Sequence, residues 1–485
     1  MEKVDVSEIK RKILSGVFAL TSRTLILQVV SVISQTLLTV ILTPAVFGTY
    51  YIATAFTDFF NYFADIGLAA ALIQKKDEPT LKDLRTVFTV QQMLITVLVV
   101  LGLIFSDTVG NFYHLDAGGI FLVRALLISF FLSSLKTIPS ILLERRLNFN
   151  LLVVPQLFES IVFNILVILF ALNGMGVYSF AWAAIARGIV GVVTIYIISP
   201  WSIGFDLSIK ELKKLLSYGV PIQANSFLAL IKDNLMTLFL GRVLNLTQVG
   251  YIGWAKKTSE LVLRLFMDNV IRVTFPAYSR LQEHLEILAK AVERSFFFLA
   301  FFIFPTSAAL ILFMHPLMEI VPRYSKWEPA LLSFYLFSFA SLWAAFSTAA
   351  INALNAIGKI KWTLILMVLW TAITWIGIPI LIHLVGFNGA AITAAIIAAT
   401  GILPIILLKR KINYDALGPL LKPLTATFLM IVLISFFLSQ IHSVISFGTL
   451  LVVFILGYAL ISFIWMKSDI KPYVLPILNK IIKNK

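Results

Sequence analysis

Apolar runs long enough to cross a bilayer recur from one end of the chain to the other, and this feature limits the fold more than any other. Of the 485 residues, 60% are hydrophobic, and the mean hydropathy is +0.96. Soluble domains are about half apolar and interrupt their apolar runs with polar faces. The sequence therefore predicts an all-α polytopic membrane protein.

Hydropathy predicts about fourteen spans, each long enough for a tilted helix. Their ranges are 17–42, 45–73, 86–106, 119–142, 151–172, 176–199, 215–241, 247–275, 294–314, 329–356, 362–385, 387–408, 422–440 and 446–466. The first run follows the basic residues at 10–12 and has no small-residue cleavage site. We therefore expect it to stay in the membrane and not to be removed as a signal peptide.

The formal net charge is +15, and the basic residues outside the spans are divided unequally between the loops on the two sides of the membrane. With the N-terminus inside, the inner segments hold nearly all the basic residues outside the spans, and the outer loops hold only Arg242, Arg323 and Lys326. This bias follows the positive-inside rule, so we expect a cytoplasmic-membrane protein with both termini in the cytoplasm. The membrane accounts for the basic surplus, and no nucleic-acid partner is expected.

A weak internal repeat predicts two halves. FGTY at 47–50 opens the second span and VGY at 249–251 opens the eighth, and an acid, Asp58 or Glu260, stands ten residues after Gly48 or Gly250. Two halves of equal orientation are typical of a parallel-repeat transporter. The predicted parts are a cytoplasmic segment 1–16, an N-lobe 17–199, a linker 200–214, a C-lobe 215–408, and two last spans with a basic tail, 409–485.

Many charges fall inside the predicted spans. The basic ones are Arg23, Arg124, Lys136, Arg187, Lys232, Lys256, Lys257, Arg264 and Arg272, and the acids are Asp58, Asp65, Glu159, Asp233, Glu260 and Asp268. Leaving every one of the basic residues against lipid would cost roughly 20–30 kcal/mol. Since the bases outnumber the acids, most must contact water, an acid or a polar ligand.

The eighth span carries a charged stripe. Glu260, Arg264, Asp268 and Arg272 follow one another at i+4, and Lys257 extends the stripe. A helix with one charged face at membrane depth fits the wall of an aqueous cavity, and Arg187 and Arg264 lie too deep to reach the interface easily. Simpler alternatives are snorkelling for Arg23 and Arg272, local pairing with Asp233 for Lys232, and interfacial placement or helix-to-helix bonding for Arg124 and Lys136.

Residue types that support chemistry are scarce. The chain has no cysteine, its five histidines show no metal-ligand spacing, and no phosphate loop, dinucleotide fingerprint or GxSxG elbow is present. We therefore expect no metal, no cofactor and no ATP hydrolysis by this chain.

Five stretches resemble the Wzx-type polysaccharide flippases of the multidrug/oligosaccharidyl-lipid/polysaccharide exporter superfamily. They are LTPAVFGTYY (42–51), DIGLAAALIQKKD (65–77), ILLERRLNF (141–149), DNLMTLFLGRVLNLTQVGYIGWA (233–255) and FPAYSRLQ (275–282). The resemblance implies two six-helix lobes around a central cavity that opens alternately to either side. It also implies two further helices that help to bind the lipid tail, and a polyprenyl diphosphate-linked oligosaccharide as substrate.

Family members place cations in the first span and around the eighth, where Arg23, Lys257 and Arg264 stand here. Span two, basic in some lipid II flippases, carries only Asp58 and Asp65. The predicted substrate-binding set is Arg23, Arg187, Lys232, Lys256, Lys257, Arg264 and Arg272. Asp58, Asp65, Glu159, Asp233, Glu260 and Asp268 are predicted to pair with these cations or to bind a coupling H⁺ or Na⁺. The expected partners are the lipid-linked substrate, membrane lipids and other polysaccharide-assembly proteins.

Three other functions stay open. A multidrug and toxin exporter of the same superfamily would favour an acidic or aromatic cavity. A polysaccharide polymerase or ligase would need a large outer loop with clustered Arg, His or Asp, and the loop 106–119 offers only His114 and two aspartates. A scaffold would not explain charges at this depth.

Overall fold

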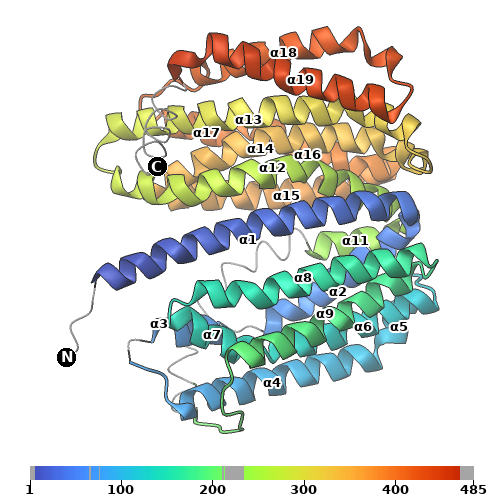
Figure 1. The fold of residues 1–485 in the computed structure, drawn as a ribbon, viewed down its shortest axis with the longest axis vertical. Coiled ribbons are helices and arrows are strands. Elements are labelled where there is room, and N and C mark those ends of the chain that lie inside the picture. The colour runs from blue at the N-terminus through green and yellow to red at the C-terminus, as the bar shows by residue number, and fades with distance from the viewer. Residues whose placement is uncertain (1–5, 65–66, 76, 210–211, 213–233, 470–485) are drawn as a thin grey trace. The chain divides into compact units, whose positions relative to one another are not determined.

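The computed structural model describes all residues except 1–5, 65–66, 76, 210–211, 213–233 and 470–485. Within these described residues every regular element is a helix (Figure 1). They include ten helical segments long and apolar enough to cross a membrane. The predicted all-α polytopic architecture is therefore confirmed. The chain divides into two compact units, Met1–Gly250 and Tyr251–Lys485.

The first unit is a bundle in which α8 packs along α9, α9 along α6, and α1 along α8. Small residues of α9 permit the close approach, because Ala181, Ala183, Ala184, Gly188 and Gly191 are all buried. The helices are α1 (Val6–Ile41), α2 (Pro44–Ala64), α3 (Leu68–Gln74), α4 (Leu81–Ile104), α5 (Ser106–Phe112), α6 (Ala117–Ser134), α7 (Thr137–Arg145), α8 (Phe149–Leu172), α9 (Val177–Ile198) and α11 (Met236–Val243).

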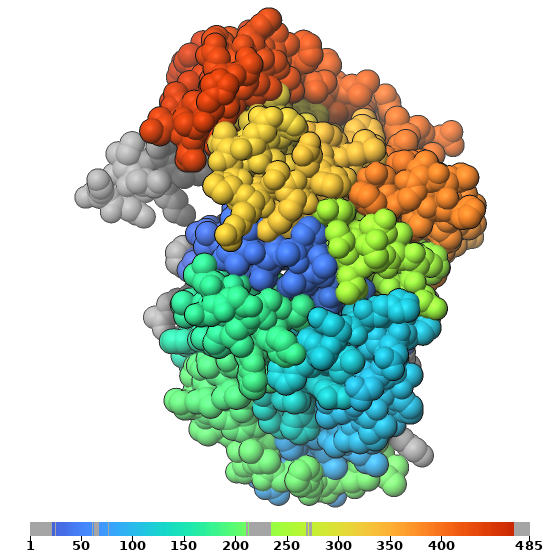
Figure 2. Space-filling view, turned by 90° about the vertical axis from the view of Figure 1, so that its right-hand side faces the viewer, coloured from blue at the N-terminus to red at the C-terminus, as the bar shows by residue number. Residues whose placement is uncertain are grey.

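The long helix α12 (Leu246–Arg280) leads into the second unit. There α13 packs against α14, and α18 and α19 pack on α13, as the red and yellow side chains in Figure 2 also show. Alanines of α14 lie buried in one cluster with Phe296 and Phe304 of α13. The remaining helices are α13 (Leu285–Ile320), α14 (Leu331–Ala356), α15 (Ile360–Val385), α16 (Gly389–Thr400), α17 (Ile402–Lys409), α18 (Gly418–Ser435) and α19 (Val444–Trp465), with short 3-10 turns η2 (Ser325–Ala330), η3 (Gly386–Asn388) and η4 (Leu438–Gln440).

Several predicted spans are interrupted helices. Span two comprises α2 and α3, and Gly67 before α3 has a φ of 74°, which favours glycine. Span four comprises α6 and α7, with a turn at Leu135 and Lys136. The predicted number of fourteen spans is not confirmed. Span seven (215–241) falls largely outside the described residues, and spans eleven and twelve lie in one apolar stretch, Ile360–Lys409. Predicted spans two (α2 with α3) and eight (α12) are not among the ten apolar segments found in the described residues.

The described part of the segment predicted as a linker packs on the first unit. Trp201 contacts Phe88 edge to face with ring centroids 5.1 Å apart. The backbone nitrogens of Asp206 and Ser208 donate hydrogen bonds to the hydroxyls of Thr89 and Thr86 on α4. These contacts fix residues 201–208 along the first turns of α4.

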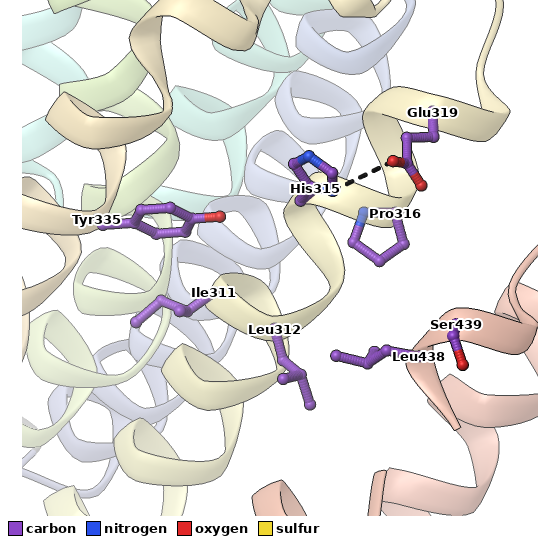
Figure 3. Close-up of a pocket in the computed structure, with 8 residues that line it drawn as sticks. All are labelled: Ile311, Leu312, His315, Pro316, Glu319, Tyr335, Leu438 and Ser439. Carbon is purple, nitrogen blue, oxygen red and sulfur yellow. Dashed lines mark ion pairs between the residues drawn. The ribbon is translucent and has the colours of Figure 1, made fainter. Parts of the chain in front are cut away.

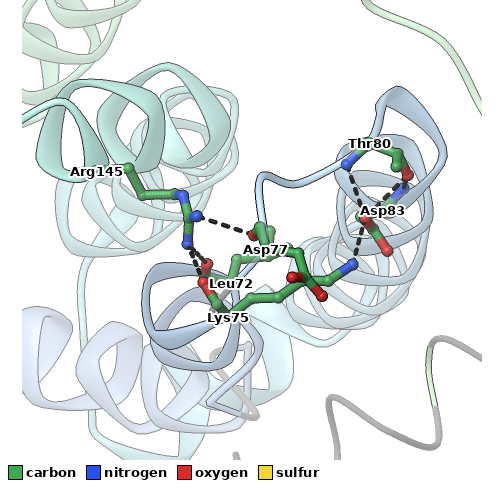
Figure 4. A network of polar contacts seen from close by, with 6 residues as sticks. All are labelled: Leu72, Lys75, Asp77, Thr80, Asp83 and Arg145. Atoms are coloured by element: carbon green, nitrogen blue, oxygen red, sulfur yellow. Dashed lines mark hydrogen bonds and ion pairs between the residues drawn. The ribbon is translucent and has the colours of Figure 1, made fainter. Parts of the chain in front are cut away.

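One arginine holds the loop between α3 and α4 (Figure 4). The guanidinium of Arg145, at the end of α7, donates to the carbonyl oxygens of Leu72, Ile73, Lys75 and Asp77 at 2.7–3.0 Å. These include carbonyls that the end of α3 leaves without intrahelical partners. Two of the sequence stretches quoted above, 65–77 and 141–149, therefore meet through this side chain.

Candidate functional site

The first unit holds a group of three charges, here named the Glu159 cluster: Lys136, Glu159 and Arg187. Lys136 Nζ lies 2.6 Å from Glu159 Oε1, and Arg187 Nε lies 3.7 Å from Glu159 Oε2. The Glu159 side chain is 8% exposed and that of Lys136 is 17% exposed, whereas that of Arg187 is 55% exposed. Lys136 and Glu159 thus form a buried ion pair, and Arg187 is the accessible member.

Helix packing places these charges together. Glu159 lies near the middle of α8 and Arg187 near the middle of α9, and these two helices pack along each other. The guanidinium of Arg187 also lies over the ring of Phe163, 5.9 Å from its centroid. Lys136 lies in the turn between α6 and α7 and extends to Glu159.

The second unit carries three charges on one helix, the Glu260 stripe: Lys256, Glu260 and Arg264 of α12. Arg264 Nη2 lies 3.0 Å from Glu260 Oε2, and Lys256 Nζ lies 3.9 Å from Glu260 Oε1. The predicted i+4 pairing of Glu260 with Arg264 is confirmed. Lys256 pairs with Glu260 at the other end of the stripe, and the place of Lys257 in the stripe stays a prediction.

The opposite face of α12 explains why the stripe is presented outward. Trp254, Ala255, Ser259 and Val262 are buried. Trp254 stacks on Trp327 with ring centroids 5.2 Å apart, and the hydroxyl of Ser259 lies 2.7 Å from the carbonyl oxygen of Ala255. With this face fixed, the charged side chains point away from the buried face, and Arg264 is 67% exposed.

The structure describes the side chains of three of the other predicted site residues, on α1, α2 and α12. Arg23 is half-buried on α1, while Asp58 on α2 and Lys257 on α12 are exposed. Asp65, Lys232 and Asp233 lie outside the described residues, as do the side chains of Asp268 and Arg272 on α12.

Lys136 belongs to the cluster although the sequence did not place it in the binding set. Its predicted helix-to-helix bonding is confirmed by the ion pair with Glu159. The same prediction is confirmed for Arg124, which contacts Asp107 and Ser106 of α5 at 2.8 and 2.7 Å. The sequence signal that could have identified Lys136 is its depth in the predicted span, since a lysine well inside a span needs an acid at the same level of the membrane.

A separate pocket of about 420 Å³ lies in the second unit (Figure 3). Its walls are mainly apolar side chains of α13 and η4, and its polar groups are His315, Glu319, Tyr335 and Ser439. His315 Nδ1 lies 3.5 Å from Glu319 Oε1, at i+4 on α13. None of the predicted site residues is among the described residues that line this pocket.

The two charge groups share one chemical character. Each sets two cations against one carboxylate, and in the Glu159 cluster, which lies in segments apolar enough to cross a membrane, Lys136 and Arg187 leave a positive excess over Glu159. Arginine offers planar paired donors and lysine a point charge, and both suit phosphate oxygens. The Glu159 cluster therefore offers an anion two cations within segments apolar enough to cross a membrane.

Solved structures share this fold. The chain is similar to a lipid II flippase MurJ in an inward closed conformation, with 17% sequence identity and a TM-score of 0.74 over 93% of this chain and 99% of that one. An inward-facing multidrug resistance MATE family transporter of the MOP superfamily is also similar, with 17% identity and a TM-score of 0.60 over 79% of this chain and 95% of that one.

Two curated proteins are similar to this chain in sequence. Teichuronic acid biosynthesis protein TuaB of Bacillus subtilis (strain 168) is 22% identical over 56% of this chain and 56% of its own length. Succinoglycan biosynthesis transport protein ExoT of Rhizobium meliloti (strain 1021) is 22% identical over 53% of this chain and 51% of its own. The chain thus covers about half the length of these relatives. The model of the polysaccharide biosynthesis protein family matches residues 37–332, more than half of the chain, so the resemblance seen in the sequence is confirmed and the chain belongs to this family.

Proposed function

We propose that this protein is a flippase, not an enzyme, that moves polyprenyl diphosphate-linked oligosaccharides from the inner to the outer leaflet of the cytoplasmic membrane for polysaccharide export. The observation that carries the proposal is the positive excess of the Glu159 cluster, whose three residues lie in helical segments long and apolar enough to cross a membrane. Membership of the polysaccharide biosynthesis protein family supports it, as do the roles of TuaB in teichuronic acid biosynthesis and of ExoT in succinoglycan biosynthesis transport.

In this proposal the cations bind the diphosphate while the lipid tail stays in the bilayer. The two lobes enclose a cationic central cavity and open it alternately to either side. An inside-negative potential favours outward movement of an anion by about 2.3 kcal/mol per charge per 100 mV, or roughly 5 kcal/mol for two charges. The potential by itself is therefore one driving force, and binding of H⁺ or Na⁺ at an acid such as Asp58 is the alternative.

The test is translocation of a polyprenyl diphosphate-linked oligosaccharide in vesicles that contain the purified protein. We expect Arg187→Ala and Arg264→Ala each to reduce the initial rate at least tenfold, since each removes about 1.4 kcal/mol or more of headgroup binding. Arg280→Ala, an exposed change in the last turn of the same helix as Arg264, is the matched control. Undiminished flipping by both test variants would remove these residues from the mechanism.

The orientation has its own test, because the chain has no cysteine. Lys359→Cys, before α15, lies on the predicted inner side, and His442→Cys, before α19, on the predicted outer side. An impermeant maleimide added to intact cells should label only the second variant. Labelling of the first variant instead would reverse the proposed topology.

A second candidate is a multidrug exporter, favoured by the fold shared with the MATE family transporter. That function predicts efflux of an organic cation such as ethidium from the same vesicles. The positive excess of the Glu159 cluster opposes cation binding, so we expect no ethidium efflux above that of empty vesicles.

A further inference from the structure

Glu159 contacts its two cations in different ways. Its Oε1 lies 2.6 Å from Lys136 Nζ, at hydrogen-bond distance, and its Oε2 lies 3.7 Å from Arg187 Nε, at ion-pair distance only. Lys136 alone would neutralise the carboxylate. The second oxygen is nevertheless directed at Arg187, so the carboxylate does more than compensate the lysine.

Gly191 makes this position available to the carboxylate. It lies on α9 four residues after Arg187, which is one helical turn. A β-carbon at Gly191 would run into Glu159 Oε1, with the carboxyl carbon and Cγ of Glu159 also too close. Only a residue without a side chain lets the carboxylate of α8 reach the surface of α9 beside the guanidinium.

The contact leaves the outer part of the guanidinium available. Glu159 approaches Nε, and the guanidinium carbon Cζ lies over the ring of Phe163. Within the described part of the chain, no group accepts a hydrogen bond from Nη1 or Nη2 of Arg187. Those two nitrogens form the planar fork that matches two oxygens of a phosphate.

We propose that Glu159 is the positioning residue for Arg187. Held by Lys136 and admitted by Gly191, its carboxylate fixes the guanidinium through Nε and directs Nη1 and Nη2 toward two oxygens of the substrate diphosphate. This inference rests on the proposed function, in which Arg187 binds the headgroup. An arginine that is already oriented loses less conformational entropy on binding, so affinity for the diphosphate depends on Glu159.

The test measures binding of farnesyl diphosphate, a soluble polyprenyl diphosphate, and of farnesol, which lacks the phosphates, to the purified full chain. The central variant is Lys136→Met with Glu159→Gln, which removes the buried ion pair as a unit and leaves no uncompensated lysine. If Glu159 only neutralises Lys136, this double variant binds both probes like the wild type. If Glu159 positions Arg187, Kd for farnesyl diphosphate rises about tenfold and Kd for farnesol is unchanged.

Gly191→Ala provides a test that changes no charge and covers the case in which the double variant does not fold. Its β-carbon displaces the Glu159 carboxylate, so the same selective loss of farnesyl diphosphate binding is expected. Gly188→Ala is the matched control one turn away, since its β-carbon also crowds a neighbouring helix, at Cδ1 and Cβ of Leu132, but displaces no charged group. Wild-type affinity for farnesyl diphosphate in Gly191→Ala would overturn the proposal, as would an equal loss for both probes.

The variant Arg187→Ala distinguishes failure of this inference from failure of the proposed function on which it rests. If Arg187→Ala binds farnesyl diphosphate like the wild type, the headgroup does not bind at Arg187 and the proposed placement of the substrate fails. If Arg187→Ala loses affinity while the double variant and Gly191→Ala keep it, only the positioning role of Glu159 fails.

Discussion

Gly48 of α2 and Gly250 of α12 occupy matching places where the two helices cross. A β-carbon on Gly48 would run into the carbonyl oxygen of Leu246, and one on Gly250 would run into that of Pro44. Each carbonyl belongs to the residue four positions before the other glycine, so the contact is reciprocal. These are the two glycines that the weak sequence repeat aligns, and their equivalent contacts agree with that repeat.

Alanine at either glycine should force the helices apart, because the obstructing atoms are backbone and cannot rotate away. We expect Gly48→Ala and Gly250→Ala each to cost about 1–3 kcal/mol and to lower the apparent Tm in detergent. The control is Gly448→Ala on α19, where nothing lies within 4 Å of the added carbon. A Tm for Gly250→Ala as high as that of the control would contradict the close crossing.

Arg145 should be sensitive even to a conservative change. Lysine cannot reproduce the fork that contacts four carbonyl oxygens, so we expect Arg145→Lys to cost about 1–3 kcal/mol and Arg145→Ala more. Limited trypsin digestion should then cut faster at Lys75, beside the carbonyls that Arg145 binds. Arg146→Ala, at the exposed neighbouring residue, should leave the rate of cleavage at Lys75 unchanged.

Trp254 should anchor the Glu260 stripe through packing. Its side chain is 1% exposed and contacts Trp327 and Phe334. We expect Trp254→Ala to cost about 3–5 kcal/mol and Trp254→Phe clearly less, because phenylalanine keeps part of the aromatic contact. Thermal unfolding in detergent measures both, and equal stability of the two variants would show that the aromatic cluster does not hold α12.

Asp415, before α18, should make the stability of the protein depend on pH in the acidic range. Its Oδ1 accepts hydrogen bonds from the backbone nitrogens of Leu417 and Gly418, both at 3.0 Å, and these bonds lower the pKa of Asp415. Because the folded pKa is depressed, this contribution is present above the unfolded value of about 3.9 and is lost as the pH falls through the folded pKa.

The group is exposed and solvent screens it, so we expect Asp415→Asn to cost no more than about 1 kcal/mol at pH 7. The difference in apparent Tm between wild type and variant should shrink as the pH falls from 6 toward 3. The control is Glu283→Gln, an exposed acid in the turn after α12. A difference in Tm that stayed constant across this range would exclude the hydrogen-bonded carboxylate as its source.

The sequence alone determined that this is a membrane protein, and it determined the positions of most of its helices. Hydropathy adds residue by residue, so spans such as 151–172 and 176–199 match α8 and α9 closely. The i+4 pair Glu260 and Arg264 was predictable for the same reason, because both residues lie on one helix and its periodicity fixes their separation. Where Gly67 or the turn at Lys136 interrupts a span, hydropathy stays high and the break does not appear.

Only the tertiary structure decided which charges share an environment. Lys136, Glu159 and Arg187 lie on separate elements, and each would pair differently if α8 or α9 were rotated about its axis. That rotation is set by packing, including the space that Gly191 leaves for a carboxylate on the neighbouring helix. Burial energies specify that deep charges need partners, but the choice of partner depends on side-chain contacts between helices, which no linear pattern encodes.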